Sequence, residues 1–280
     1  MYIFLRESKI LLEYGGRFIN LDTTSEITCS QTFKETSIDR RTLHSRKNFF
    51  KAKWIRATNA VSASLSLYIT DNFLELLFFE LAGWTNYGQG LSYPDYESNI
   101  PETFNLYFIA PEAQYKLSNC VITSIDLSFN KMFCGNLTIG IDATSLDSVD
   151  ANPTHFTQGK HLQVTALNTA IGNVSINPIS AGISFTRTLE YLNSETVHNS
   201  HLNVQNNRCI VTDSNISATI SAYLVTPPIA DIDTIKIEQS NLTFSINNAL
   251  ITKRESLSDI YLCAFDISPT ETTNTITLSY

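Results

Sequence analysis

Strict alternation of apolar and polar residues marks two segments of this 280-residue chain. Residues 61–68 read VSASLSLY and residues 216–223 read ISATISAY, so apolar side chains occupy every second position in both segments. A period of two places successive side chains on opposite faces of a strand, which is typical of a strand with one buried face. Near the N-terminus, residues 10–14 and 17–21 flank Gly15-Gly16, a pair that suits a type I′ hairpin turn. The pattern predicts a mainly β fold.

The alternating segments belong to a long-period repeat. Residues 61–68 match residues 216–223 at an offset of 155, and residues 16–33 match residues 172–189 at an offset of 156, with Ile27 on Ile183. A third block, residues 122–129, matches residues 237–244 at an offset of 115, which implies a loss of about 40 residues from the second copy. Three blocks in the same order predict two tandem β domains, residues 1–150 and 151–280. The alternative is that two unrelated β domains share a similar alternation.

One segment has the pattern of a helix. Residues 72–82 carry a broad apolar face, Asn72 can cap the first turn, and Glu75 can complete a capping box. Gly83 can end the helix in the left-handed conformation. We expect this single helix, at about residues 72–82, to flank a sheet in the first domain. The corresponding stretch of the second half contains Pro227-Pro228, which leaves no room for a helix of that length.

Composition agrees with a strand-rich protein and limits its setting. The chain is 43% hydrophobic and only 16% charged, which disfavours an all-α fold. Its cysteines are odd in number and lack a C-x-x-C pair, so we expect buried free thiols and neither a disulfide framework nor a structural zinc site. The five are Cys29, Cys120, Cys134, Cys209 and Cys263. The first apolar run is too short for a signal peptide, and no run reaches the roughly 20 residues of a membrane span.

Motifs that carry chemistry are absent. The chain has no G-x-S-x-G, P-loop, G-x-G-x-x-G or H-E-x-x-H string, so we predict no enzyme, no metal site and no cofactor. His198 and His201 lack a nearby ligand partner and are interpreted as loop residues. A calcium site at Asp142, Asp147 and Asp150 is the weaker interpretation of an Asp-rich linker, because the spacing is not that of an EF-hand loop.

Aromatic residues between Trp84 and Tyr96 resemble a sugar-binding loop in composition alone. They motivate an alternative function from another class, a β-sandwich module that binds glycans or a host surface. A hydrolase is disfavoured further, because no nucleophile and base can be paired from their spacing.

Charge is unevenly distributed along the chain. Residues 34–56 hold eight basic and two acidic side chains, a balance of +6, whereas the whole chain carries −8 and the remainder therefore −14. Such asymmetry predicts a basic arm that docks on an acidic neighbouring copy. The candidate contact residues are Lys34, Arg40, Arg41, Arg46, Lys47, Lys51, Lys53 and Arg56.

A nucleic-acid patch is the competing interpretation of the arm. Phe49, Phe50 and Trp54 lie among the basic residues, as in proteins that stack bases on aromatic rings. The overall negative charge opposes this interpretation, because it repels phosphate over most of the surface.

The order of these features resembles the duplicated tail tube proteins of long-tailed, non-contractile bacteriophages. The resemblance is carried by a strand pair, a long arm, an alternating strand that ends in Tyr (residues 64–69), an apolar helix and a closing strand pair (residues 120–130 and 136–143), after which the pattern returns. Residues 176–185, INPISAGISF, resemble the opening of the family's second copy. The resemblance covers most of the chain, although a second helix and an immunoglobulin-like decoration are missing.

This resemblance implies two tandem tail-tube-like β-sandwich or barrel domains. Three chains would close a ring of six pseudo-equivalent domains, and stacked rings would form the conduit for DNA ejection in the virion tail, assembled in the host cytoplasm. The expected partners are copies of the chain itself, as a trimer, and the tape measure, baseplate and terminator proteins. Genomic DNA would pass the acidic lumen without specific binding, and the basic arm would be the contact between rings. A tube-initiating, baseplate or tail-end ring protein of the same fold is the first alternative.

Overall fold

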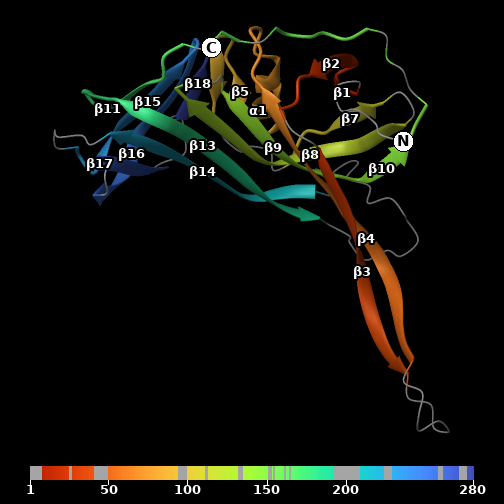
Figure 1. Ribbon diagram of the computed structural model, residues 1–280. Coiled ribbons are helices and arrows are strands. Elements are labelled where there is room, and N and C mark those ends of the chain that lie inside the picture. Colours follow the sequence, from red (N-terminus) through yellow and green to blue (C-terminus); the bar gives the residue numbers. More distant parts are fainter. Residues whose placement is uncertain are drawn as a thin grey trace.

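The computed structural model describes residues 8–24, 27–40, 50–93, 100–110, 113–131, 135–150, 153, 155–160, 162–163, 165–191, 209–223, 229–257, 261–270 and 276–280. It confirms the mainly β fold with one short helical segment (Figure 1). The elements of the first half are β1 Lys9–Tyr14, β2 Arg17–Leu21, β3 Thr28–Arg40, β4 Phe50–Tyr68, η2 Leu74–Leu76, α1 Leu77–Leu81, β5 Thr85–Asn86, β6 Gly90–Ser92, β7 Phe104–Ile109, β8 Gln114–Asn130, β9 Asn136–Ala143 and β10 Ser145–Ser148. Those of the second half are β11 Asn168–Ile171, β12 Val174–Ile176, β13 Pro178–Tyr191, β14 Cys209–Tyr223, β15 Ile232–Gln239, β16 Leu242–Leu257, β17 Tyr261–Pro269 and β18 Ile276–Ser279.

Strand pairing follows the same scheme in both halves of the chain. In the first half, β1 pairs with β2 and β7, β8 pairs with β7, β9 and β10, and β4 pairs with β3 and β9. In the second half, β11 pairs with β12 and β15, β16 pairs with β15, β17 and β18, and β14 pairs with β13 and β17. Among the described strands, each of these seven antiparallel pairs of the first half has a counterpart in the second half, whereas the short pair β5–β6 has none.

Two further pairings join the halves into one continuous sheet. The C-terminal part of β8 pairs with β13, and the last strand, β18, pairs with β6. The first of these junctions creates a row of eight hydrogen-bonded strands in the order β3, β4, β9, β8, β13, β14, β17 and β16. We call this row the inner sheet.

Alternation along the inner sheet separates a buried face from a polar face. In β4, Val61, Ala63, Leu65 and Leu67 are buried, and the serines between them are exposed or half-buried. Residues 216–223 of β14 behave in the same way, so the strand prediction is confirmed for both alternating segments. Because residues opposite each other in paired strands share a face, the buried positions add up to one apolar layer.

Glycines set the first hairpin as the sequence predicts. Gly15 and Gly16 connect β1 and β2 with φ angles of 57° and 76°, the positive values that a type I′ turn requires. Tyr14 pairs with Arg17 on either side of the turn.

The helix is shorter than the predicted 72–82 and begins differently. Phe73, not Asn72, precedes the first turn, and its φ of 53° allows only the 3₁₀ turn η2 before α1 begins. The predicted capping box does not form, because the Glu75 carboxylate accepts hydrogen bonds from Thr70. The predicted end is confirmed. Gly83 has a φ of 92°, and the N–H groups of Gly83 and the next residue donate to carbonyls of α1 in a Schellman arrangement.

An aromatic cluster packs the helical segment against both halves. Trp84 makes edge contacts with Phe79, Tyr93 and Phe185, the last of which lies in β13. Only 3% of Trp84 is exposed, so the indole is a core residue. The segment 82–93 thus covers the apolar face of the β8–β13 junction.

The third block of the predicted repeat is wrong. Residues 122–129 lie within the single strand β8, whereas residues 237–244 run from β15 through a turn at Ser240-Asn241 into β16. The pairings make β16 the counterpart of β8, and Ser256 the counterpart of Ser128. The offset there is 128, so the second half is shorter by 27 residues at this point.

Candidate assembly surfaces

The predicted basic arm is a long antiparallel hairpin. Strands β3 and β4 pair from Thr28 and Ser64 as far as Arg40 and Phe50, and the distal part of the hairpin extends away from the body (Figure 1). Two irregularities, between Gln31 and Phe33 and one step further on, add twist where the hairpin leaves the inner sheet. The backbone can therefore present charged positions at a distance from the rest of the chain.

Five of the eight predicted contact residues fall on this hairpin. Lys34 and Arg40 lie in β3, and Lys51, Lys53 and Arg56 lie in β4, with Lys51 opposite Asp39. Arg41, Arg46 and Lys47 lie outside the described residues. Phe50 and Trp54, the aromatic residues of the competing nucleic-acid interpretation, also lie in β4, and Phe49 lies outside the described residues.

The polar face of the inner sheet is rich in small hydroxylic side chains. Four strands contribute three alternate positions each, and ten of these twelve residues are Ser or Thr. They are Ser62, Ser64 and Ser66 of β4, Ser124, Asp126 and Ser128 of β8, Ser180, Gly182 and Ser184 of β13, and Ser217, Thr219 and Ser221 of β14. Such a surface offers hydrogen bonds but little apolar area, so nothing drives it to bury itself against another sheet.

Two acidic residues of the polar face contact neighbouring side chains, and Asp126 of β8 is exposed on the same face. Asp142 accepts hydrogen bonds from Ser62 at 3.0 Å and from Tyr191 at 2.8 Å. Asp266 forms an ion pair with Arg254 on the neighbouring strand. Most of the negative charge outside the arm therefore lies elsewhere than on this face.

The two outermost strands of the inner sheet each leave one side without a described strand. Strand β3 pairs with β4 alone, and its residues Thr28–Ser30 are exposed. At the other end, the last part of β16, Arg254–Leu257, pairs with β17 alone. We call Thr28–Ser30 the donor edge and Arg254–Leu257 the acceptor edge. Unpaired strand edges of this kind are templates for pairing with another chain.

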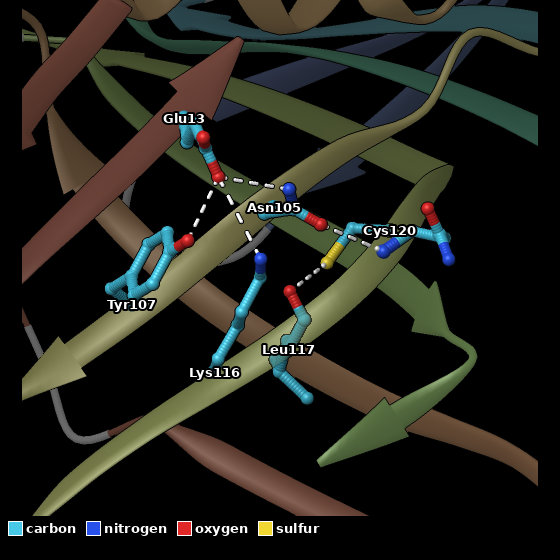
Figure 2. A network of polar contacts seen from close by, with 7 residues as sticks. Glu13, Asn105, Tyr107, Lys116, Leu117 and Cys120 are labelled. Atoms are coloured by element: carbon cyan, nitrogen blue, oxygen red, sulfur yellow. Dashed lines mark hydrogen bonds and ion pairs between the residues drawn. The ribbon is translucent and has the colours of Figure 1, made fainter. Parts of the chain in front are cut away.

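A polar network holds the outer strands β1, β7 and β8 together (Figure 2). The Glu13 carboxylate accepts hydrogen bonds from Asn105 and Tyr107, each at 2.9 Å, and lies 3.8 Å from the Lys116 ammonium group. The same ammonium lies 5.0 Å from the centre of the Tyr107 ring, and burial is the main cause that raises the pKa of Tyr107. These groups satisfy one another, so the network supports a structural role.

The cysteines are free thiols where the structure describes them. Cys120, Cys209 and Cys263 are buried as predicted, and burial raises the pKa of Cys209 to about 11. Cys29 was expected to be buried and is exposed, because it lies on the donor edge. Cys134 lies outside the described residues.

The weaker chemical candidates do not converge on a site. Within the described part of the chain, no group of three His, Cys, Asp or Glu residues could hold a metal ion. His198 and His201 lie outside that part. Trp84, the first aromatic residue of the supposed sugar-binding loop, is buried in the core, which removes the main residue of that alternative. No helix in the described ranges has the length and apolar content to cross a membrane.

The two sheet edges are the surfaces that sequence reasoning missed. One signal was available at the acceptor edge: Lys253, Arg254 and Glu255 interrupt the alternation of β16. Charged residues, lysine above all, are a common feature of edge strands. The donor edge carries no such signal, because Thr28–Ser30 continues an ordinary alternating strand.

Comparison with known proteins gives the family. The whole chain, residues 1–280, matches the Bacteriophage Baseplate Tube Protein Family. Baseplate tube protein p140 of Escherichia phage T5 is 30% identical to this chain over 296 residues, which cover 100% of the chain and 98% of that protein.

Proposed function

Because the chain belongs to the bacteriophage baseplate tube protein family, a family of structural proteins of the phage tail, we propose that it closes into rings through the donor and acceptor edges. The observation that carries this proposal is the β8–β13 junction, where the two halves of one chain already pair edge to edge. The donor edge lies on the counterpart of β13, and the acceptor edge lies on the counterpart of β8. A second copy can therefore repeat the internal junction.

The division into two tandem domains, residues 1–150 and 151–280, is part of this proposal. It is supported by the two matching sets of strand pairings. The segment between the halves, which includes residues 155–160, also packs on the first half. Asn20 donates to the Thr157 carbonyl at 2.8 Å, and Asp71 donates its N–H to the Lys160 carbonyl at 2.8 Å.

A head-to-tail contact of this kind forms either a closed ring or an open helix, depending on the rotation between copies. We propose three chains for this ring, the number that the resemblance to duplicated tail tube proteins implies, which makes six pseudo-equivalent units. Each chain brings the eight strands of the inner sheet, so three chains give a barrel of about 24 strands. Barrels of about 16–18 strands already enclose an aqueous channel.

The polar face of the inner sheet would line this channel. Its hydroxyl groups and few free charges give phosphate neither a cluster of cations to bind nor apolar area to displace water from. DNA would therefore pass without specific binding. In such a ring, the apolar face of the inner sheet packs into the wall of the tube. The basic arm contacts the next ring.

The relative from phage T5 is a baseplate tube protein, which favours the baseplate end of the tube over the tube body for this chain. The two roles differ in stacking, because an end protein forms a ring that other tail proteins extend. Tape measure and terminator proteins are expected partners of the tube in either role.

Negative-stain microscopy of the purified protein tests the proposal. We expect annular particles with a central hole, which stay single for a baseplate role and stack for a tube role. A control variant, Tyr87→Ser, changes an exposed residue outside both edges and should leave the particles unchanged. Protein that stays monomeric at high concentration, in both low and high salt, would contradict ring formation.

A further inference from the structure

The internal junction gives the residue-level geometry of the contact between copies. We propose that the acceptor edge receives the base of the β3–β4 hairpin of a second copy in one defined register, with Cys29 of one copy opposite Glu255 of the next. The exposed pair Ile232 and Leu250, which we call the foot of the acceptor edge because Leu250 precedes that edge along β16, is part of the contact. This inference rests on the proposed ring and adds the docking surface, the partner segment and the register.

Strand pairing fixes which residues of β8 and β16 are equivalent. The alternating strands β4 and β14 end at Tyr68 and Tyr223. The residue of β9 that pairs with Tyr68 also pairs with Ser128, and the residue of β17 that pairs with Tyr223 also pairs with Ser256. Ser128 and Ser256 therefore occupy the same position in their halves.

The two terminal tyrosines also align β3 with β13. Ala63 and Ala218 both lie five residues before the terminal tyrosine of their strand. Ala63 pairs with Cys29, and Ala218 pairs with Ile183. Cys29 is thus the counterpart of Ile183, two residues away from Ile27, the match that the sequence repeat predicts.

The register of the internal β8–β13 junction predicts the register of the β16–β3 contact between two copies. Ile183 pairs with Leu127 in the β8–β13 ladder. Leu127 precedes Ser128, so its counterpart is Glu255. Applied to two copies, the ladder places Cys29 opposite Glu255, and the neighbouring pairs follow in antiparallel order.

A second observation marks the foot of the acceptor edge. In the first half, Val121 of β8 is fully buried in a small cluster with Cys209, against which Leu189 and Tyr191 pack. These three residues lie at the distal end of the β13–β14 ladder, where the pairing continues past the β8 junction. The β13–β14 hairpin of the second half therefore covers an apolar residue of the first half.

The counterpart of that apolar residue is uncovered. Val121 pairs with Asp142, which lies six residues after the β9 partner of Ser128. Leu250 pairs with Ser268, which lies six residues after the β17 partner of Ser256, so Leu250 is the counterpart of Val121. Leu250 is 45% exposed, and Ile232, which pairs with it on β15, is 56% exposed. Two large aliphatic side chains on one face, where the first half has a covered valine, mark a site that a further hairpin would cover.

The occupant follows from the fold. The hairpin that corresponds to β13–β14 is β3–β4, and its donor edge has no described strand beside it. Within the chain, the described strands β3 and β16 stand at opposite ends of the eight-strand row and do not pair with each other. The hairpin must therefore come from a second copy.

A single cysteine substitution tests the register. Opposite residues of an antiparallel pair have Cα atoms roughly 4.5–5.5 Å apart, within the range of a disulfide. Glu255→Cys would therefore bond to the native Cys29 of the next copy under mild oxidation. Non-reducing gel electrophoresis should show covalent oligomers up to the size of the ring, and the reduced sample should show only the single chain.

Matched variants separate the register from the ring. Three control proteins should give no cross-linked species. Wild type has no cysteine on the acceptor edge, Arg254→Cys places its thiol on the other face of β16, and the double variant Glu255→Cys with Cys29→Ser lacks the thiol of the donor edge. Rings in the microscope without a disulfide in Glu255→Cys, or cross-linking of Leu257→Cys in its place, would overturn the register while the ring stands. Absence of rings in wild type would overturn the proposed function itself.

The foot of the site has its own test. Ile232→Asp and Leu250→Asp place a charge in the contact, so each should weaken association at least tenfold in sedimentation measurements. Ile100→Asp is the matched control, an isoleucine of similar exposure in the loop before β7. Equal association of all three variants would overturn the role of this pair.

Discussion

A buried carboxylate holds the turn before the helical segment in place. Glu75 is 1% exposed, and its carboxylate accepts the N–H of Thr70 at 2.9 Å and the hydroxyl of Thr70 at 2.8 Å. The sequence suggests a capping role for Glu75 because spacing alone cannot show that the chain turns back at Thr70. Burial, the largest cause, raises the pKa of Glu75 above its ordinary value.

Glu75→Gln should alter the pH dependence of stability. Because the pKa of Glu75 is raised in the folded protein, the unfolded chain loses this proton first as the pH rises. The stability that Glu75 supports is therefore complete below its ordinary pKa of about 4.5 and decreases as the pH rises toward the folded value. Urea unfolding at several pH values should show that the difference in free energy, wild type minus variant, falls with increasing pH. A constant difference would contradict this account.

Arg187 joins the halves through backbone carbonyls. Its Nε and Nη2 donate to the Ile122 carbonyl at 3.0 and 2.6 Å, and its Nη1 donates to the Ala82 carbonyl at 3.2 Å. Arg187 lies in β13, whereas both carbonyls belong to the first half. Nothing in the sequence identifies this arginine, because its partners are main-chain atoms.

Arg187→Met should destabilise the protein by about 1–3 kcal/mol, because it leaves buried carbonyls without their donor. Thermal unfolding measures the effect. Arg17→Met, at the exposed first position of β2, is the control and should change the unfolding free energy by less than about 0.5 kcal/mol. Equal effects of the two substitutions would show that Arg187 does not hold the junction.

At the scale of elements, alternation predicts strands well and turns poorly. The first hairpin was predictable because Gly15-Gly16 marks its turn. The turn between β15 and β16 consists of Ser240-Asn241, both with positive φ, and resembles an ordinary polar step in an alternating pattern. The third repeat block therefore matched one continuous strand to two strands. Pairing between strands, which a single sequence does not contain, was needed to find β16 as the counterpart of β8.

The C-terminal strand β18 links the two halves by pairing with a strand of the first half. Strand β18 pairs with β6, and Ile276 and Leu278 are fully buried. A Cβ atom on Gly90 would lie 2.7 Å from the Leu278 carbonyl oxygen. Close approach of two backbones explains why a glycine occupies this position.

Gly90→Val should therefore loosen β18. Hydrogen exchange of residues 276–279 should become faster than in wild type, because the added side chain displaces the strand. Gln89→Val, in the neighbouring exposed position, is the control and should leave this exchange unchanged. Unaltered protection of β18 in the Gly90 variant would contradict the claim that the close approach of Gly90 holds this strand in place.

Charge on the arm belongs to the contact between rings in our proposal. Replacing its eight basic residues with Gln should leave single rings intact and abolish their contact with the next ring. The donor edge lies at the base of the hairpin, whereas the five described basic positions lie farther along β3 and β4. Sedimentation of wild-type assemblies should show the same loss at high salt, where such contacts are screened. Variant rings that stack like wild type would assign the contact to another surface.

At the scale of the whole molecule, the sequence predicted the β fold and a bacteriophage tube protein, but not the assembly surface. The donor edge looks like any alternating strand, and its importance appears only when β8 and β13 are seen to pair. The exposed Ile232 and Leu250 lie in two strands that the sequence joined incorrectly. The structure adds the partner of each strand, and the unpaired ends then indicate how copies meet.

Native mass spectrometry of the purified protein tests ring closure most directly. One chain has a mass of 31.4 kDa, so three chains give about 94 kDa. We predict a dominant species at that mass, or at whole multiples of it where rings stack. A single chain at every concentration, or a ladder of species that increases by one chain at a time without a preferred size, would contradict the closed ring.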